Sequence, residues 1–489
     1  ANALIGGKPH STYAAHVYAP AALNRIVGEV HDADPVMIAE AFQRAHAAQP
    51  AWNDKGGDGR AGVLEAMADA LEAKHDSLCA VLVREAGKSW PDAVAEVREA
   101  ADFCRYYAKL AREQFSGSIS LTGPVGERNA HSLHGRGVFV CISPWNFPLA
   151  IFTGQIAAAL AAGNAVLAKP AEQTPLIAHK AVKLFYGAGL HPDLLALLPG
   201  DGIKVGAALV AHPGIAGVAF TGGTDTARAI NRTLAAKDGP IVPFIAETGG
   251  LNGMFVDTTA LKEQVVDDVI TSAFGSAGQR CSALRLLFVP KELADAYIET
   301  LKGAMDQLRI GDPADFDVDT GPVIDADALS LLNRHLKTLS DKGQVLHRTP
   351  LPADLNGHFF APTLAEISDP SELEREVFGP ILHIVRYDSQ NAESMTRALA
   401  ERGYGLTLGV HSRLEAFADA IMHAVPAGNV YVNRTVTGAV VGVQPFGGEG
   451  LSGTGPKAGG PLALTRFASE RAVSVNITAQ GGDPALLNL

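Results

Sequence analysis

The chain has 489 residues, which is too long for one compact core and predicts two or three domains. Hydrophobic residues make up 47% and charged residues 19%, a composition typical of a soluble globular protein and not of a disordered one. The net charge of −12, without any Lys/Arg-rich run, excludes a general nucleic-acid surface, so we expect no nucleic-acid partner.

The cysteines and the apolar stretches exclude further classes of protein. Four cysteines stand at positions 79, 104, 141 and 281, without a CxxC pair or a zinc-type Cys/His spacing, so we expect no metal site. Such scattered cysteines do not form a disulfide framework, and they favour the reducing cytoplasm. The longest apolar stretch, residues 151–162, is interrupted and too short to span a bilayer, so we expect no membrane contact.

The first part of the chain predicts helices followed by an arm. Residues 35–115 carry Ala, Leu, Glu and Arg at helical spacing. Residues 116–134 are polar, rich in Gly and Ser, and without helical periodicity, so they predict a hairpin or an arm.

From Gly137 onward, short apolar strands alternate with helices. Thr174 and Pro175 are typical of a helix N-cap followed by the first helical residue. The alternation predicts a parallel, doubly wound sheet with right-handed crossovers. The expected strands are 138–142, 164–168, 193–198 and 217–221, and the expected helices are 151–162, 174–187, 203–211 and 226–236.

A second alternating stretch predicts a second α/β domain. The expected strands are 241–247, 253–256 and 284–289, the expected helices are 261–274 and 293–308, and further alternation continues to about 433. The remainder is a glycine-dense loop interleaved with apolar residues. We therefore expect a first domain over 1–246, with 115–135 contributing to an arm, a second over 247–433, and a terminal segment over 434–489.

Cys281 is the first candidate for chemistry. It lies among small and polar residues after a long predicted helix, which favours an accessible sulfur. A cysteine attacks only as a thiolate, and the adjacent Arg280 is a candidate cation to favour that form. The competing interpretation is that Cys281 is a small hydrophobic core residue, as most free cysteines are.

Two polar residues at predicted strand ends are candidate partners of the thiol. Glu247 ends an apolar strand, where burial would raise its pKa and suit a general base. Asn146 lies on a loop made rigid by Pro144 and Pro148, and its amide could stabilise an oxyanion. The competing interpretations are a solvent-facing glutamate and an ordinary loop.

Residues after two other strands are candidates for binding a dinucleotide. Lys169 and Glu172 follow a strand where ribose contacts are typical, and the charge of Glu172 favours NAD over NADP. Thr221, Gly222 and Gly223 open a helix whose N-terminus could approach a phosphate, although the glycines could equally serve a tight turn.

One apparent phosphate motif is excluded. Gly87, Lys88 and Ser89 match the end of a P-loop, but Leu82 stands where its first glycine belongs, and no strand–loop–helix context is present.

Taken together, these residues resemble the aldehyde dehydrogenase superfamily over about residues 25–475. Each motif alone is weak, but their shared order is highly specific. In chain order they are Pro144-Trp145-Asn146-Phe147-Pro148, Lys169-Pro170-Ala171-Glu172, Phe220-Thr221-Gly222, Glu247-Thr248-Gly249-Gly250, Gly278-Gln279-Arg280-Cys281, Glu376-Val377-Phe378-Gly379-Pro380 and Pro445-Phe446-Gly447-Gly448. The resemblance implies an α/β aldehyde dehydrogenase fold, with a Rossmann-like NAD domain, an α/β catalytic domain and a β-arm for oligomerisation.

The resemblance also implies a role for each residue. Cys281 would be the nucleophile, Glu247 the base and Asn146 the oxyanion donor. The implied NAD contacts are Ile142, Pro144, Trp145, Lys169, Glu172, Thr221, Gly222, Gly223, Glu376 and Phe378. Two positions depart from the family pattern: Gly223, where many members carry a serine beside the pyrophosphate, and Thr248, where leucine is usual.

Further features resemble the branch that oxidises L-glutamate γ-semialdehyde. Ser282 directly follows Cys281, and residues 437–442 precede 444–448 as in that branch, in which Ser282 and the backbone at Gly438 and Ala439 would hold the substrate's α-carboxylate and amino group. Phe147, Arg280 and Phe446 would complete the substrate site. Residues 478–487 resemble the end of this module in bacterial bifunctional enzymes of proline catabolism.

The implied activity is NAD-dependent oxidation of L-glutamate γ-semialdehyde, in equilibrium with Δ1-pyrroline-5-carboxylate, to L-glutamate. The expected partners are a small-molecule aldehyde, a second copy of the chain in a dimer or larger oligomer, and a proline dehydrogenase module in the native polypeptide. The rivals are another aldehyde or semialdehyde dehydrogenase, including a CoA-acylating one, and a catalytically silent structural relative.

Overall fold

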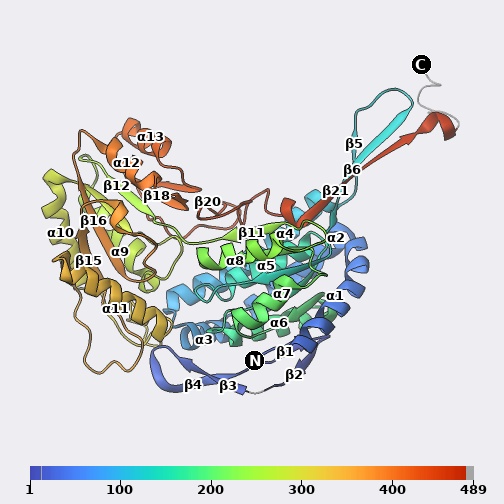
Figure 1. Cartoon of the computed structure of the whole chain (residues 1–489), viewed down its shortest axis with the longest axis horizontal. Coiled ribbons are helices and arrows are strands. Elements are labelled where there is room, and N and C mark those ends of the chain that lie inside the picture. Colours follow the sequence, from blue (N-terminus) through green and yellow to red (C-terminus); the bar gives the residue numbers. More distant parts are fainter. Residues whose placement is uncertain (13, 481–489) are drawn as a thin grey trace.

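The computed structural model describes residues 1–12 and 14–480 and contains two large sheets at opposite ends of an elongated body (Figure 1). The predicted resemblance at 478–487 therefore lies, from residue 481 on, outside the described residues. In the described part of the chain, no helix is long and apolar enough to cross a membrane.

The first sheet has five parallel strands extended by an antiparallel N-terminal hairpin. In sheet order the strands are β11 (Phe244–Glu247), β10 (Gly217–Thr221), β7 (Val138–Ile142), β8 (Ala165–Lys169), β9 (Leu195–Leu197), β1 (Ala3–Ile5) and β2 (Lys8–His10). The helices are α1 (Pro35–Asp54), α2 (Gly56–Ala73), α3 (His75–Ala86), α4 (Trp90–Phe115), α5 (Ala150–Ala161), α6 (Pro175–Gly187), α7 (Ala207–Ala211) and α8 (Thr224–Ala235). The predicted doubly wound sheet is confirmed.

The second sheet is parallel except for one edge strand. In sheet order the strands are β14 (Val345–Arg348), β15 (Thr363–Ile367), β16 (Ile381–Tyr387), β13 (Leu286–Pro290), β12 (Gly253–Val256), β18 (Thr407–His411) and β19 (Asn429–Val432), with β14 antiparallel. Its helices are α9 (Lys262–Phe274), α10 (Lys291–Met305), α11 (Ala326–Asp341), α12 (Ala392–Ala400) and α13 (Glu415–Ala424). The domain boundaries at 246 and 433 stay a prediction.

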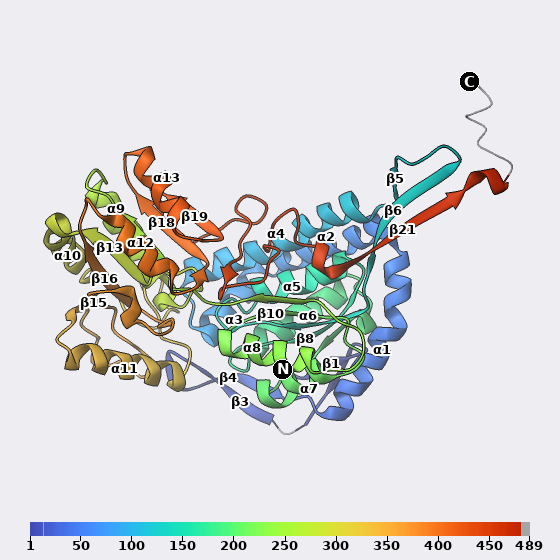
Figure 2. The same cartoon turned by 45° about the horizontal axis from the view of Figure 1, so that its top comes forward.

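The segment predicted as a hairpin or an arm forms a three-stranded antiparallel sheet. It consists of β5 (Ile119–Leu121), β6 (Glu127–Gly135) and β21 (Ala468–Asn476). Both views show it projecting from the body, with β6 and β21 side by side (Figures 1 and 2). The smaller pairs are β3 (Ala14–Ala19) with β4 (Ala22–His31), and β17 (Tyr404–Gly405) with β20 (Glu449–Gly450).

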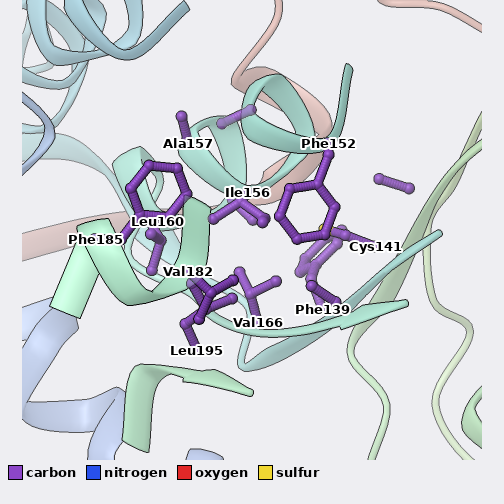
Figure 3. Packing of buried hydrophobic residues seen from close by; sticks show 14 of the residues in the cluster. Phe139, Cys141, Phe152, Ile156, Ala157, Leu160, Val166, Val182, Phe185 and Leu195 are labelled. Atoms are coloured by element: carbon purple, nitrogen blue, oxygen red, sulfur yellow. The ribbon is translucent and has the colours of Figure 1, made fainter. Parts of the chain in front are cut away.

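The core beneath the first sheet explains why its strands are continuous apolar runs. Phe139 and Cys141 of β7 pack beside Phe152 and Ile156 of α5 (Figure 3), and all four side chains are buried. A parallel strand covered on both faces has no polar side to present. Burial also raises the pKa of the Cys141 thiol, so this cysteine is an inert core residue.

Helix α6 begins as predicted but is capped differently. The Thr174 side chain forms no capping hydrogen bond. Instead, the Glu85 carboxylate of α3 accepts from the N–H of Leu176 at 2.6 Å and of Ile177 at 2.9 Å. A carboxylate satisfies helix N-terminal N–H groups better than a hydroxyl, because it also complements the helix dipole. Burial raises the pKa of Glu85 to about 8.

Three other predicted elements are shorter or of a different kind. The strand expected at 193–198 begins as a 3-10 turn, Pro192–Leu194, and the strand expected at 241–247 starts only at Phe244. The helix expected at 203–211 opens with a π-type turn, Gly202–Gly206. Its start is capped by Asp201, whose carboxylate accepts from the N–H of Ile203 at 2.6 Å.

Candidate active site

The carboxyl ends of the parallel strands in the first sheet gather four predicted site residues. Ile142 of β7 is paired with Lys169 of β8 on one side and with Phe220 of β10 on the other. Thr221 of β10 is paired with Glu247 of β11. This register places all of them at the one edge where ligands bind in open α/β sheets.

Cys281 follows a turn of unusual backbone conformation after α9. Ser276, Ala277 and Gly278 have φ values of 54°, 53° and 66°, so three successive residues are left-handed. Glycine adopts this conformation freely, but for serine or alanine it costs roughly 1–3 kcal/mol each. The turn leaves Cys281 partly exposed, whereas the other three cysteines are buried. Its carbonyl accepts from the side-chain amide of Asn252 at 2.6 Å.

The thiol of Cys281 has a raised pKa. Burial is the main cause, and the carboxylates of Glu376 and Glu247 add to it, so that the pKa is about 12. The guanidinium of Arg285 lowers this pKa. The guanidinium of the adjacent Arg280 pairs with the Asp92 carboxylate.

Arg285 is fully buried and ties the loop that carries the nucleophile to the second sheet. Its guanidinium donates to the carbonyls of Gly278 at 2.7 Å and of Arg280 at 3.0 Å. It also pairs with the carboxylate of Glu376 at 3.0 Å. Glu376 approaches so closely that a Cβ on Gly249 would lie 1.6 Å from one of its oxygens, so only glycine fits there.

Asn146 lies next to the nucleophile. Its side-chain amide donates to the carbonyl of Gln279 at 3.1 Å, two residues before Cys281. One of the two amide hydrogens is used in this bond, and the other is available to an oxyanion on the substrate.

Glu247 is held by the glycine-rich C-terminal loop. One carboxylate oxygen accepts from the N–H of Gly448 at 2.9 Å. A Cβ at Gly447 or Gly453 would lie 2.8 Å from a carboxylate oxygen, so these glycines leave room for the side chain. Burial raises the pKa of Glu247 to about 8, against the lowering effects of the Gly448 N–H and of Lys457. This value suits a base at near-neutral pH.

The thiol and the carboxylate meet in one cavity of about 470 Å³. Cys281 and Glu247 line it, and so does each residue predicted to bind the substrate: Phe147, Arg280, Ser282, Gly438, Ala439 and Phe446. The rest of the wall contains a face of α4 that the sequence did not identify. Its charged members are Lys88, which precedes the helix, Asp92, Glu96, Arg98, Glu99 and Asp102.

The charges of this wall are arranged in pairs. Lys88, set aside as a P-loop remnant, forms an ion pair with Glu96 at 2.7 Å and lies 4.2 Å above the Phe147 ring. Burial and the nearby Glu96 raise the pKa of Glu99 to about 7. The available signal was the helical spacing of Asp92, Glu96 and Glu99, which puts three carboxylates on one face of an otherwise amphipathic helix.

The predicted cofactor residues form two groups of contacts. Lys169 pairs with Glu172 at 3.1 Å, and Glu172 also accepts from the N–H of Gly202. In the other group, the ring of Trp145 meets Phe378 edge to face at 5.5 Å. Pro144 lies in the same loop as Trp145, between β7 and α5.

Gly223, at the N-terminus of α8, faces open space. Gly223 precedes α8 with ordinary extended backbone, and a Cβ there would meet nothing within 4 Å. A Cβ on Gly222, in contrast, would lie 2.6 Å from the Phe220 ring. A dinucleotide with two riboses and a pyrophosphate fits these groups. They are the N–H groups at the start of α8, the carboxylate of Glu172, and the pair of Glu376 and Arg285.

Comparison with known proteins agrees with this geometry. Residues 8–473 match the sequence model of the aldehyde dehydrogenase family. The chain belongs to the aldehyde dehydrogenase family. The bifunctional protein PutA of Klebsiella aerogenes is 47% identical over 480 residues, which are 96% of this chain but 36% of the PutA chain. The 1-pyrroline-5-carboxylate dehydrogenase of Geobacillus kaustophilus is 35% identical, and the match covers 93% of this chain and 88% of that enzyme.

Two solved structures of aldehyde dehydrogenase relatives have the same fold. A 1-pyrroline-5-carboxylate dehydrogenase from Thermus with bound NAD has a TM-score of 0.93 at 33% identity, covering 97% of this chain and 92% of that one. A bifunctional proline utilization A protein has a TM-score of 0.90 at 55% identity, covering 92% of this chain and 46% of that one. The chain thus spans less than half the length of these two PutA relatives.

Proposed function

We propose that this aldehyde dehydrogenase oxidises L-glutamate γ-semialdehyde to L-glutamate with NAD. The observation that carries the proposal is a single cavity in which Cys281 and Glu247 face Ser282, Gly438 and Ala439. The relatives named 1-pyrroline-5-carboxylate dehydrogenase support the substrate, and the Thermus relative with bound NAD supports the cofactor.

Recognition of the amino-acid end of the substrate follows from the charges of the cavity. Gly438 has a φ of 80°, and backbone N–H groups at such a turn form a concavity for an anion. With the buried hydroxyl of Ser282, this turn receives the α-carboxylate. The carboxylate of Glu99, on the α4 wall, receives the α-ammonium. The aldehyde end then points toward Cys281.

The chemistry uses three side chains in sequence. The Cys281 thiol gives its proton to water, and the resulting thiolate attacks the aldehyde carbon. The Asn146 amide with the N–H of Cys281 stabilises the oxyanion. Lys169, Glu172 and Glu376 would hold NAD, which would supply the hydride acceptor needed to convert the thiohemiacetal on Cys281 into a thioester. Glu247 then takes a proton from water, which attacks the thioester and releases glutamate. Arg285 keeps the Cys281 loop and Glu376, a contact for the nicotinamide ribose, in fixed relation.

Lys457 sets the pH range of the base. The charge of Lys457 partly offsets the burial that raises the pKa of Glu247. Replacing Lys457 with methionine removes this charge, and the pKa of Glu247 then rises above about 8. Since a base acts only when deprotonated, the rising limb of kcat against pH moves to higher pH, by roughly 0.5–1 unit. Steady-state rates from pH 6 to 10 measure it. Lys457→Arg keeps the limb in place, and a shift to lower pH for Lys457→Met contradicts the assignment.

Gly223 offers no side-chain hydroxyl to the pyrophosphate of NAD, so we expect NAD to bind less tightly than it would to a serine at this position. Gly223→Ser adds a hydroxyl in open space at the start of α8, and we expect the Kd of NAD to fall roughly 2- to 10-fold. Calorimetric titration with NAD measures the change. Gly223→Ala supplies the Cβ without the hydroxyl and leaves the Kd unchanged. Weaker binding by the serine variant would place the phosphates elsewhere.

Two rival functions differ in a simple assay. A CoA-acylating semialdehyde dehydrogenase forms NADH only with CoA, whereas hydrolysis through Glu247 needs water alone. We expect NADH from glutamate semialdehyde and NAD without CoA. A requirement for CoA favours the acylating enzyme, and no NADH with any aldehyde favours a silent structural relative.

The bifunctional PutA relatives support a larger assembly. We propose that the chain works beside a proline dehydrogenase module in its native polypeptide, since it covers 36% of the Klebsiella PutA chain. The arm of β5, β6 and β21 is the proposed contact with a second copy, because an exposed sheet edge favours pairing. The proposed NAD domain is 1–246, with 115–135 contributing to the arm, and the proposed catalytic domain is 247–433. Residues 434–489 are proposed to supply an active-site anchor loop, a return to the NAD domain and a C-terminal oligomerisation segment.

A further inference from the structure

The left-handed turn before Cys281 is held by a residue from a distant helix. One oxygen of the Asp92 carboxylate, near the start of α4, accepts from the Ser276 hydroxyl at 2.6 Å. The other oxygen accepts from the guanidinium of Arg280, the residue directly before Cys281. Asp92 therefore holds the first residue of the turn and the last residue before the nucleophile at once.

Each oxygen of the Asp92 carboxylate is occupied by a contact with the loop that leads to Cys281. Its side chain is 14% exposed and that of Arg280 is 19% exposed, so the pair is shielded from water. Although burial opposes ionisation, the positive charges of Arg280 and Lys88 and the Ser276 hydroxyl keep the pKa of Asp92 below its ordinary value. The carboxylate is thus a fixed charge that neutralises Arg280.

The same helix also fixes the other half of the reaction centre. Glu96, one turn after Asp92, accepts from the N–H of Leu149 at 2.8 Å and of Ala150 at 3.3 Å. These N–H groups end the loop that carries Asn146 and begin α5. Helix α4 therefore sets the distance between the oxyanion donor and the nucleophile.

We propose that Asp92 is a positioning residue, which holds the turn of Ser276, Ala277 and Gly278 left-handed so that the Cys281 thiol meets the donor of Asn146. The inference rests on the proposed function only in taking Cys281 as the nucleophile. Without the carboxylate, the Ser276 side chain loses this contact, and Ser276 and Ala277 relax toward ordinary backbone angles. The thiol then moves away from its partner.

The test compares Asp92→Ala with wild type in two independent measurements. We expect kcat for glutamate semialdehyde to fall roughly 10²-fold with KM within about twofold, since small displacements of reacting groups cost that much. We also expect iodoacetamide alkylation of Cys281, followed by mass spectrometry of its peptide, to slow at least tenfold. Glu113→Gln, an exposed carboxylate at the far end of α4, is the matched control and changes neither.

A second substitution tests the turn itself. Ala277→Gly removes the energetic cost of the left-handed conformation, because glycine adopts it freely. We expect the double variant Asp92→Ala/Ala277→Gly to recover at least a third of the decrease in log kcat that Asp92→Ala causes. If Asp92→Ala does not fold, Ser276→Ala removes one of its two contacts and is expected to lower kcat and alkylation together.

Several outcomes would overturn the positioning role. A raised KM with unchanged alkylation would make Asp92 a substrate contact, and an absence of rescue by Ala277→Gly would show that the turn is not what it holds. Because alkylation needs neither substrate nor turnover, it tests the turn even if wild type forms no NADH. A wild-type protein that forms no NADH would refute the proposed function and would leave the positioning role of Asp92 intact.

Discussion

Replacing Cys281 with alanine lowers NADH formation by roughly 10⁴-fold or more, while the Kd of NAD stays within about twofold of wild type. The thiol forms the covalent bond on which every later step depends, and no other cysteine in the described residues is exposed to replace it. The predicted cofactor contacts Lys169, Glu172 and Glu376 are untouched by the change. Stopped-flow absorbance at 340 nm and calorimetry measure the two quantities.

The matched control for the thiol is Cys79→Ala. Cys79 is buried in α3, so its loss lowers stability by about 1 kcal/mol and leaves kcat unchanged. Retention of more than a hundredth of wild-type activity by Cys281→Ala would mean that the covalent mechanism is wrong.

Replacing Glu247 with glutamine separates the two halves of the reaction. The first turnover needs no water, so NADH still forms in a burst of one equivalent per site. Hydrolysis of the thioester then slows roughly 10²- to 10⁴-fold, because the amide cannot take the proton. Rapid mixing with excess substrate shows the burst, and mass spectrometry of the quenched protein shows an acyl group on Cys281.

The control for this experiment is Glu449→Gln, an exposed carboxylate in the same glycine-rich loop. It is expected to show wild-type steady-state rates and no trapped acyl group. Loss of the burst in Glu247→Gln would place this glutamate before hydride transfer and would contradict its role as the hydrolytic base.

The elements of the fold that were predictable are those whose bounds follow from a local sequence pattern. Strands 217–221 and 253–256 match the structure residue for residue, since each is a short apolar run bounded by loop residues. The cap of α6 was not predictable, because Glu85 lies far from Leu176 along the chain and displaces the local candidate Thr174. Propensity describes neighbours in sequence, and tertiary contacts override it.

The candidate site followed from residues near the ends of recognisable elements. Cys281 and Glu247 line one cavity, and the Asn146 amide contacts the loop that leads to Cys281. The residues that hold them were missed, because Asp92, Glu96 and Arg285 act across long separations in sequence. Their partners are carbonyls, N–H groups and charges that no local pattern in the sequence reveals.

The most direct test of the proposed reaction is a comparison of three aldehydes that differ only in the charged end. We predict that kcat/KM with NAD is highest for L-glutamate γ-semialdehyde. It falls roughly 10- to 100-fold for 5-oxopentanoate, which lacks the ammonium, and further for pentanal, which lacks both charges. Equal kcat/KM values for the three aldehydes would contradict the account, because a cavity that holds neither the carboxylate nor the ammonium is a general aldehyde site.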